Sequence, residues 1–399
     1  MAQRVSVDEH AAFVRSLLAG LGARSTERVA LADALGRITA SPVESPIALP
    51  PFRNSQMDGF AVHAAEVTAA PVSLPIAGEV AAAAGVPAPL APGTAVRIMT
   101  GAAVPEGADA IVPVEDTEAD AEGTRVRILR PRVAGEYVRE AGSDLAAGAD
   151  VLPAGVKLAS RHLAAAAASG LTELLVRERV RVAVVSTGSE LVPPGSRLGP
   201  GEIPDSNGVA LAAAVRATGA VVVHEARVRD DIDRLRVELD TARDAGAELV
   251  VTSGGISKGA YEVVRELLEP LGAWVGSVAM QPGGPQATAA YRGMPVIGFP
   301  GNPVSAQLSF EIFVAPTLRA IAGMPPAVTE PLELAEPLTS VPGKRQFLRG
   351  RRTDDGRAVV VGGAGSHLVA ALAASDLLIV VPEDVEGLDV GAEVDTVEL

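Results

Sequence analysis

The stretch Leu249–Gly259, LVVTSGGISKG, is an apolar, β-branched run that passes directly into a turn with paired glycines, two serines and a lysine. Two further stretches repeat this arrangement, Val182–Leu191 (VAVVSTGSEL) and Val296–Ala306 (VIGFPGNPVSA). A turn between a buried strand and a helix leaves backbone N–H groups unpaired at the positive end of the helix dipole, where an oxyanion or a phosphate binds. Three such turns in one segment predict one anion site.

Strand and helix patterns alternate around these stretches, from Arg179 to Ala322. Alternation with continuous apolar strands is typical of a parallel sheet that is covered by helices on both faces. Ligands of such sheets bind at the carboxyl ends of the strands, and all three glycine turns fall on that edge. We therefore predict a central three-layer α/β domain at residues 177–325.

The segments before this domain predict two smaller ones. Capping signals indicate a helix at Ser6–Leu18, a second at Glu27–Gly36 and a third, capped by Ser160, that ends at Gly170. Short Val/Ile-rich runs between Val72 and Arg139 alternate with Gly and Pro turns, which indicates a β domain. We predict a discontinuous helical domain at 1–48 and 143–176, with an inserted β domain at 49–142.

The chain after Pro325 and Pro326 again shows only strand patterns. Asp355-Gly356 between two β-rich runs is a strong signal for a hairpin. Residues 326–399 are predicted to form a β-barrel-like domain or a sandwich.

Composition limits the classes of function. The net charge of −15 and the aromatic content of 3% argue against nucleic acid as a partner. Cysteine is absent, which excludes disulfides, zinc-thiolate sites and thiol nucleophiles, and the five histidines are scattered, so a carboxylate-held Mg²⁺ is the favoured ion. The first twenty residues do not resemble a signal peptide and no run of eighteen apolar residues occurs, so we expect a soluble, cytoplasmic protein without membrane contact.

Each motif also has a purely structural interpretation. Thr252–Gly259 favours an anion site over a flexible loop with a solvated lysine, and it is not a Walker loop. Glu190 is able to hold Mg²⁺ or to orient a polar ligand. Asp205 is explained by capping of the next helix, although it would also add a carboxylate to the rim. Asn54–Phe60 and Thr100–Ala102 fit ordinary turns by themselves.

Taken together, these segments resemble one family, the molybdopterin molybdenumtransferases of the MoeA and gephyrin E-domain type. The matching stretches follow the order of the family across nearly the whole chain, and the loop NSQMDG is highly specific. They are PPFRNSQMDGFAV (50–62), TGAAVP (100–105), TGSEL (187–191), DSN (205–207), TSGGISKG (252–259) and GFPGNPVSA (298–306).

The resemblance implies a central domain of the MogA type, and a homodimer of four-domain subunits in which the partner's second-domain side completes each active site. It implies that adenylylated molybdopterin and molybdate are substrates, that AMP is released in a Mg²⁺-dependent step, and that contacts form with molybdopterin adenylyltransferase and molybdoenzymes. The implied catalytic residues are Asp58, Thr100, Glu190 and Glu262, with Glu190 and Asp205 as metal ligands. The implied pterin-binding residues are Ser253, Gly254, Gly255, Ser257, Asp205, Asn207, Gly301, Asn302 and Pro303.

The chain departs from the family pattern in two places. Gln281-Pro-Gly-Gly284-Pro replaces the usual Lys-Pro-Gly-Lys-Pro, so both lysines are lost, and Gly259-Ala-Tyr-Glu262 lacks the first acid of Gly-Asp-Tyr-Asp. Lys258 stands where the family usually has valine, and we interpret it as a compensating cation at the catalytic site.

Three functions follow from these observations. The first is a transferase that inserts molybdate and releases AMP. The second is a non-catalytic paralogue or scaffold that holds molybdopterin or the finished cofactor, which the lost lysines favour. The third is a generic nucleotide-binding enzyme, which lacks both the Walker and the Gly-x-Gly-x-x-Gly signatures.

Overall fold

A computed structural model describes residues 4–256 and 262–399 of the chain. The chain divides into two compact units, which we call the β-rich unit (Glu27–Val176) and the α/β unit (the described residues up to Thr26, and Arg177–Leu399). The segment before residue 27 thus clusters with the α/β unit and not with residues 143–176. The finer division into four domains stays a prediction.

The core of the β-rich unit is a six-stranded sheet in the order β7-β4-β6-β5-β9-β8. Gly59 on β4 faces the neighbouring strand so closely that a Cβ atom there would lie 2.1 Å from the carbonyl oxygen of Val112, which only glycine avoids. The predicted Val/Ile-rich runs between Val72 and Arg139 are confirmed as strands, β5, β6, β7 and β9 among them. The bounds are β4 Gly59–Val62, β5 Val72–Val80, β6 Ala95–Ile98, β7 Ala110–Pro113, β8 Thr117–Ala119 and β9 Arg125–Ile128.

The rest of the β-rich unit consists of strand pairs and one helix, α2 (Ser160–Ala168). The predicted helix at Glu27–Gly36 is wrong, because its first half is a strand whose residues alternate between exposed and half-buried. Ser160 is the first helical residue and not the cap, since the N-cap is Ala159, whose N–H donates to Nδ1 of His162. The pairs are β1 (Thr26–Ala30) with β12 (Glu173–Arg177), β2 (Val43–Glu44) with β11 (Asp150–Leu152) and β3 (Asn54–Ser55) with β10 (Val138–Arg139).

The α/β unit contains a six-stranded sheet in the order β16-β13-β17-β21-β20-β18. The strands β16, β13, β17 and β21 are parallel, as predicted, whereas β20 pairs antiparallel with both β21 and β18. The sheet is therefore mixed, and β20, which begins at a proline, was not predicted. The bounds are β13 Arg181–Thr187, β16 Val221–Val228, β17 Leu249–Ser253, β18 Trp274–Ser277, β20 Pro285–Tyr291 and β21 Met294–Phe299.

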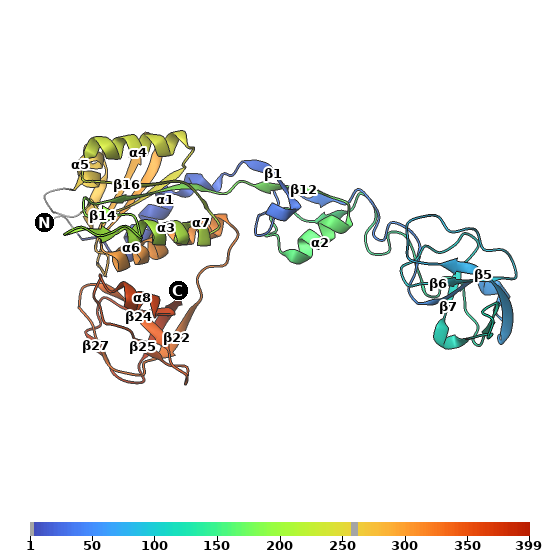
Figure 1. The fold of residues 1–399 in the computed structure, drawn as a ribbon. Helices are drawn as coiled ribbons and strands as arrows, with labels where there is room; N and C mark the ends of the chain where they lie inside the picture. Colours follow the sequence, from blue (N-terminus) through green and yellow to red (C-terminus); the bar gives the residue numbers. More distant parts are fainter. Residues whose placement is uncertain (1–3, 257–261) are drawn as a thin grey trace. The chain divides into compact units, whose positions relative to one another are not determined.

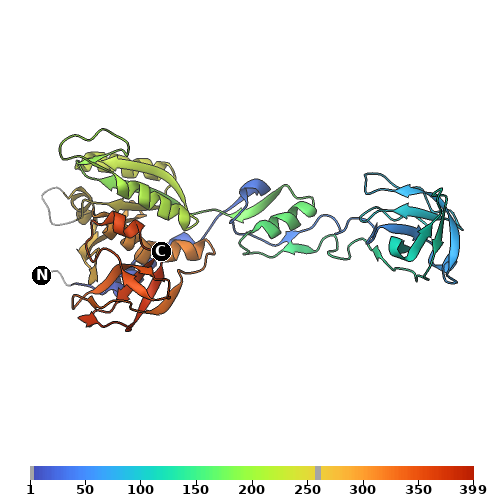
Figure 2. The ribbon, with the colours of Figure 1, turned by 60° about the horizontal axis from the view of Figure 1, so that its bottom comes forward.

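Helices cover both faces of this sheet, which confirms the three-layer arrangement (Figures 1 and 2). Alternate residues of β13 show why: Val182 and Val184 belong to one buried cluster, and Ala183 and Val185 belong to another. The first cluster includes α1 (Val7–Leu17), α3 (Ser206–Ala217), α6 (Pro303–Ser309), the π-helical turn η6 (Phe310–Val314) and α7 (Ala315–Ile321). The second includes α4 (Ile232–Asp244) and α5 (Val263–Leu268).

The C-terminal part of the α/β unit forms its own sheet, in the order β19-β24-β26-β28-β22, with β25 paired to β24. The predicted hairpin is present, since β24 and β25 pair antiparallel across Gly356, which has φ +84°. Strand β19 comes from the preceding α/β sequence and adds to this sheet in parallel. The bounds are β19 Met280–Gln281, β22 Thr329–Glu333, β24 Arg345–Arg352, β25 Ala358–Val360, β26 Leu377–Val381 and β28 Glu393–Glu398, with the short helix α8 at Val369–Ala373.

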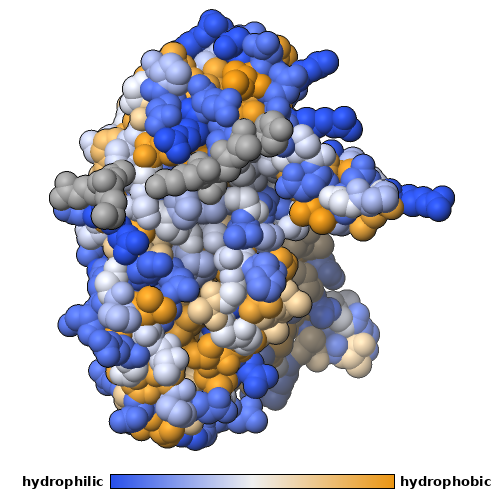
Figure 3. Space-filling model, turned by 90° about the vertical axis from the view of Figure 1, so that its left-hand side faces the viewer, coloured by the Kyte–Doolittle hydropathy of each residue, from blue (hydrophilic) through white to orange (hydrophobic). Residues whose placement is uncertain are grey.

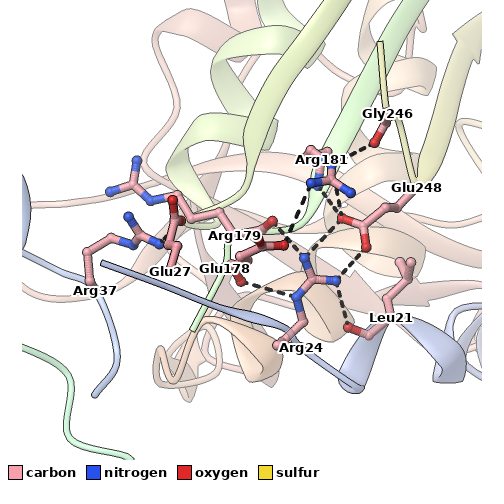
Figure 4. A network of polar contacts seen from close by, with 9 residues as sticks. All are labelled: Leu21, Arg24, Glu27, Arg37, Glu178, Arg179, Arg181, Gly246 and Glu248. Carbon is pink, nitrogen blue, oxygen red and sulfur yellow. Dashed lines mark hydrogen bonds and ion pairs between the residues drawn. The ribbon is translucent and has the colours of Figure 1, made fainter. Parts of the chain in front are cut away.

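A buried arginine ties the N-terminal segment to the amino ends of β13 and β17 (Figure 4). The Arg24 side chain is 4% exposed and forms a two-pronged ion pair with Glu248, with N···O distances of 2.7 and 3.0 Å. It also donates to the carbonyl oxygens of Glu178 and Arg179. This contact closes the end of the sheet that lies opposite the glycine turns.

Candidate active site

Three glycine turns lie side by side at one edge of the α/β sheet. The strands β13, β17 and β21 are adjacent, and their register places Ser186 opposite Ser253 and Ser253 opposite Phe299. The turns that follow contain Gly188, Gly254 and Gly301. The predicted convergence of the three turns is confirmed.

Close packing between two of these turns requires glycine. Gly254 has φ +87°, and a Cβ atom there would lie 2.4 Å from the carbonyl oxygen of Thr187. Gly255 has φ +67°, and a Cβ atom there would lie 2.9 Å from the hydroxyl oxygen of Thr187. Both conformations are left-handed and favour glycine, so the turns pack backbone against backbone.

A cavity of about 1100 Å³ opens over this edge. Figure 3 shows the face of the molecule on which β14 (Leu191–Val192) lies in Figure 1. Hydrophilic and hydrophobic residues are mixed on this face. Most of the residues predicted from the sequence line the cavity together. They are Glu190, Asp205, Asn207, Gly254, Gly255, Glu262, Gly301, Asn302 and Pro303.

Of the predicted binding or catalytic residues that the structure describes, three do not appear in this lining, namely Ser253, Asp58 and Thr100. Ser253 is 1% exposed and its hydroxyl lies 3.4 Å from that of Ser186, so its side chain is packed inside the sheet. Ser257 and Lys258 lie outside the described residues.

The start of α3 brings two polar side chains into the wall of the cavity. Asp205 caps the helix, accepting a hydrogen bond from the Gly208 N–H at 2.9 Å, and its other carboxylate oxygen lies 3.5 Å from Nε of Arg227. Asn207 donates to the carbonyl oxygen of Gly301 at 2.8 Å, which links the turn after β21 to α3. Its Oδ1 atom is buried without a hydrogen-bond partner among the described residues and is free to accept one from a ligand.

Asp58 and Thr100 form a separate arrangement in the β-rich unit. One carboxylate oxygen of Asp58 accepts hydrogen bonds from the Thr100 N–H at 2.7 Å and from its hydroxyl at 2.8 Å. These bonds, the backbone one first, together with the charge of Arg97, hold the pKa of Asp58 below its ordinary value. Both residues are exposed, so an ionised carboxylate is presented to solvent.

Several residues in the lining were not predicted. Asp230 was not among the predicted site residues, and Gln281 and Gly284 were noted only as departures from a family pattern. Arg4, Lys344 and His367 were missed altogether. Strand pairing places Lys344 here, because β19 joins β24 across more than sixty residues of sequence, and no local signal in the sequence reveals this contact.

The fit of a metal ion was tested on the donor atoms present. Within residues 4–256 and 262–399, no group of three or more His, Asp or Glu side chains is arranged to hold a metal. Both oxygens of Asp205 already have partners, in Gly208 and Arg227. The Glu190 carboxylate is exposed beside Gly188, so its oxygens are accessible from the cavity.

Three family models match successive parts of the chain. Residues 5–170 match "MoeA N-terminal region (domain I and II)", residues 183–320 match "Probable molybdopterin binding domain" and residues 331–399 match "MoeA C-terminal region (domain IV)". Among the described residues, no helix is both long and apolar enough to span a membrane.

Curated and solved relatives cover the same extent. Molybdopterin molybdenumtransferase 2 of Mycobacterium tuberculosis is 41% identical and covers 99% of both chains. The molybdopterin molybdenumtransferase of Nostoc sp. is 40% identical over 75% of this chain and 70% of its own. A crystal structure of a molybdopterin biosynthesis MoeA protein from Pyrococcus horikoshii superposes with a TM-score of 0.79 at 32% identity, covering 99% of each chain.

Proposed function

The chain belongs to the MoeA family of molybdopterin molybdenumtransferases, and on this premise we propose that its cavity inserts molybdate into adenylylated molybdopterin and releases AMP. It is a transferase of molybdenum cofactor biosynthesis. The curated relatives named above are all enzymes, so the comparisons give no support to the non-catalytic alternative.

The observation that carries the proposal is the meeting of the glycine turns after β13, β17 and β21 at one cavity. Breaking a phosphoanhydride requires stabilisation of negative charge on its oxygens, and backbone N–H groups at the ends of strands supply this without a side-chain nucleophile. In this proposal the amides around Gly254, Gly255 and Gly301 hold the pterin phosphate, and Asn207, Asn302 and Pro303 shape its pocket. Ser253 remains a proposed contributor through its backbone, and Ser257, which lies outside the described residues, also stays a proposed contributor.

The carboxylates have a different role in the proposal. Glu190 and Glu262 line the cavity. In the β-rich unit, the hydroxyl and the N–H of Thr100 keep the Asp58 carboxylate charged and oriented, and we propose a catalytic role for this pair. We propose that Glu190, and Asp205 if its present partners are displaced, contribute oxygen ligands to Mg²⁺ brought by the substrate. When bound, such an ion neutralises phosphate oxygens.

The remaining proposals concern the assembly. We propose a cytoplasmic homodimer that receives its pterin from molybdopterin adenylyltransferase and passes the product to molybdoenzymes. The full-length match to MoeA proteins supports this proposal.

The test is AMP release from adenylylated molybdopterin, Mg²⁺ and molybdate, followed by chromatography. Asp58→Ala is expected to slow release by about a hundredfold or more, because a proposed catalytic carboxylate is lost. Its matched control is Asp120→Ala. Asp120 likewise accepts the N–H and the hydroxyl of one threonine, Thr124, both at 2.7 Å but on its two different oxygens, and it lies outside the proposed machinery.

Asp120→Ala is expected to keep the wild-type rate, and neither variant should change the melting temperature by more than a few degrees, since Asp58 is exposed and Asp120 is only half-buried. A wild-type protein that melts at a higher temperature with the pterin, yet releases no AMP, would contradict the proposed function.

A further inference from the structure

The described lining of the cavity carries more negative than positive charge, although its proposed substrates are anions. Among the described residues that line it are four carboxylates, Glu190, Asp205, Asp230 and Glu262, but only two permanent cations, Arg4 and Lys344. Molybdate is a dianion and the pterin carries a phosphate, so carboxylates at the cavity would repel both. Gln281 and Gly284, which line the same wall, add no charge.

We propose that Lys344 is the cation that holds a tetrahedral oxyanion of the substrates, molybdate or the pterin phosphate, at the wall formed by Gln281–Gly284. This inference rests on the proposed function. It adds a substrate-positioning residue that comes from the C-terminal sheet.

The backbone fixes Lys344 on both sides. The Gly343 N–H donates to the carbonyl oxygen of Glu383 at 2.7 Å, and the Arg345 N–H donates to that of Ala279 at 2.9 Å. The second bond belongs to the β19–β24 pairing, which aligns Met280 with Arg345. Lys344 is therefore held one residue from the strand that leads into the Gln281–Gly284 loop.

The two adjacent cations differ in whether their charge is already matched. Arg345 forms a two-pronged ion pair with Asp8, at 2.8 and 2.9 Å, and a further one with Glu383 at 3.1 Å. For Lys344, no ion pair or hydrogen bond of the ammonium group occurs within the described part of the chain. Its charge is thus available to a ligand, while that of Arg345 stabilises the fold.

Arg4 approaches the same segment from the other side. Val5 forms an isolated parallel bridge with Val278, which places the preceding residue, Arg4, beside this segment. Lys344 borders the same segment because the next residue, Arg345, pairs with Met280. The chain uses lysine at only three positions, Lys157, Lys258 and Lys344, among 34 basic residues. A compact ammonium on a flexible stem suits an anion that must enter and leave, whereas arginine prefers fixed two-pronged pairs.

The experiment compares Lys344→Met, Lys344→Arg and Lys157→Met in the full-length protein. Lys157→Met makes the same charge change in the β-rich unit and serves as the control. AMP release is measured while molybdate is varied at saturating pterin, and then while the pterin is varied at saturating molybdate. Binding of molybdate alone and of AMP alone is measured by calorimetry.

Lys344→Met is expected to raise the half-saturating concentration of one substrate by about tenfold or more, as for loss of a charge-assisted contact, while Lys344→Arg and Lys157→Met stay within about threefold of wild type. A rise for molybdate identifies that anion, and a rise for the pterin identifies its phosphate. The inference would be overturned if Lys344→Met left the half-saturating concentrations of both substrates unchanged. It would also be overturned if Lys344→Met and Lys344→Arg raised both concentrations equally. Either result would leave the proposed function intact.

If the wild-type protein releases no AMP, the proposed function fails. The oxyanion site is then tested by calorimetry, which compares the binding of molybdate alone and of AMP alone to the wild type and to Lys344→Met. Binding of either probe that is weakened about tenfold or more in Lys344→Met then supports the oxyanion site. Equal binding in the wild type and Lys344→Met, or no binding of either probe to the wild type, refutes it.

Discussion

At the scale of single residues, His10 illustrates how burial changes a side chain's chemistry. It lies on α1, is 2% exposed, and packs against Trp274 and Phe313 with ring-centroid distances of 4.9 and 4.6 Å. Its Nε2 atom has no hydrogen-bond partner within the described residues. Burial lowers the pKa of His10 to about 4, so the folded protein holds a neutral ring that packs as an aromatic residue.

His10 should make the α/β unit less stable in mild acid. The unfolded chain takes up the proton near pH 6.5 but the folded one only near pH 4, so stability falls as pH decreases through that window, by up to about 3 kcal/mol. Above pH 6.5 His10 contributes no pH dependence. In urea unfolding at pH 7.5 and 4.5, His10→Phe should lose less stability on acidification than wild type. If wild type and His10→Phe lost the same free energy of unfolding between pH 7.5 and pH 4.5, the His10 ring would already be accessible to protons in the folded protein.

At the scale of elements, long-range pairing and not local preference decides several boundaries. The Ala- and Leu-rich stretch after Thr26 was predicted to be helical, but β1 pairs with β12, about 145 residues away, and only a short 3₁₀ turn at Leu31–Asp33 follows. The same holds at the amino end of the sheet, where Arg24 depends on carbonyls and a carboxylate from distant segments (Figure 4). Burial opposes ionisation of Glu248, yet bonds from Arg24 and the Arg181 N–H outweigh it and lower its pKa.

Arg24→Met should lower the free energy of unfolding of the α/β unit by about 3 kcal/mol, because Glu248 and the carbonyl groups of Leu21, Glu178 and Arg179 lose their bonds to the guanidinium. The control is Arg236→Met, which removes an exposed pair with Asp233 at 2.8 Å and should cost less than about 1 kcal/mol. Denaturant unfolding at pH 7 measures both variants. Similar losses in the two would mean that the Arg24 network contributes no more than a surface pair.

At the scale of the whole molecule, each unit has hydrophobic cores of its own. The clusters around Phe60, Ile98 and Leu158 contain only residues of the β-rich unit. Those around Phe299, Val250 and Ile379 contain only residues of the α/β unit. The chain enters and leaves the β-rich unit once each, at residues 26–27 and 176–177.

Calorimetry of the full-length protein should therefore resolve two unfolding transitions, since cooperativity depends on a shared core. Arg24→Met should shift only the transition of the α/β unit. The fragment Glu27–Val176, expressed alone, should fold and melt at the temperature of the other transition. A single transition for the whole chain, with an unfolded fragment, would contradict independent cores.

The sequence by itself determined the local chemistry of this protein. Glycines at positive φ, helix caps such as Ser6 and Asp205, and β-branched runs specify turns and strands within a few residues, so Glu190, Asp205, Gly254 and the turn at Gly301 were found without a structure. Only the tertiary structure decided what faces them. Strand β20 beginning at Pro285, the burial of Ser253 and the arrival of Lys344 at the cavity that Gln281 also lines depend on pairing between distant segments. Such pairing is set by the packing of the whole sheet and leaves no local pattern in the sequence.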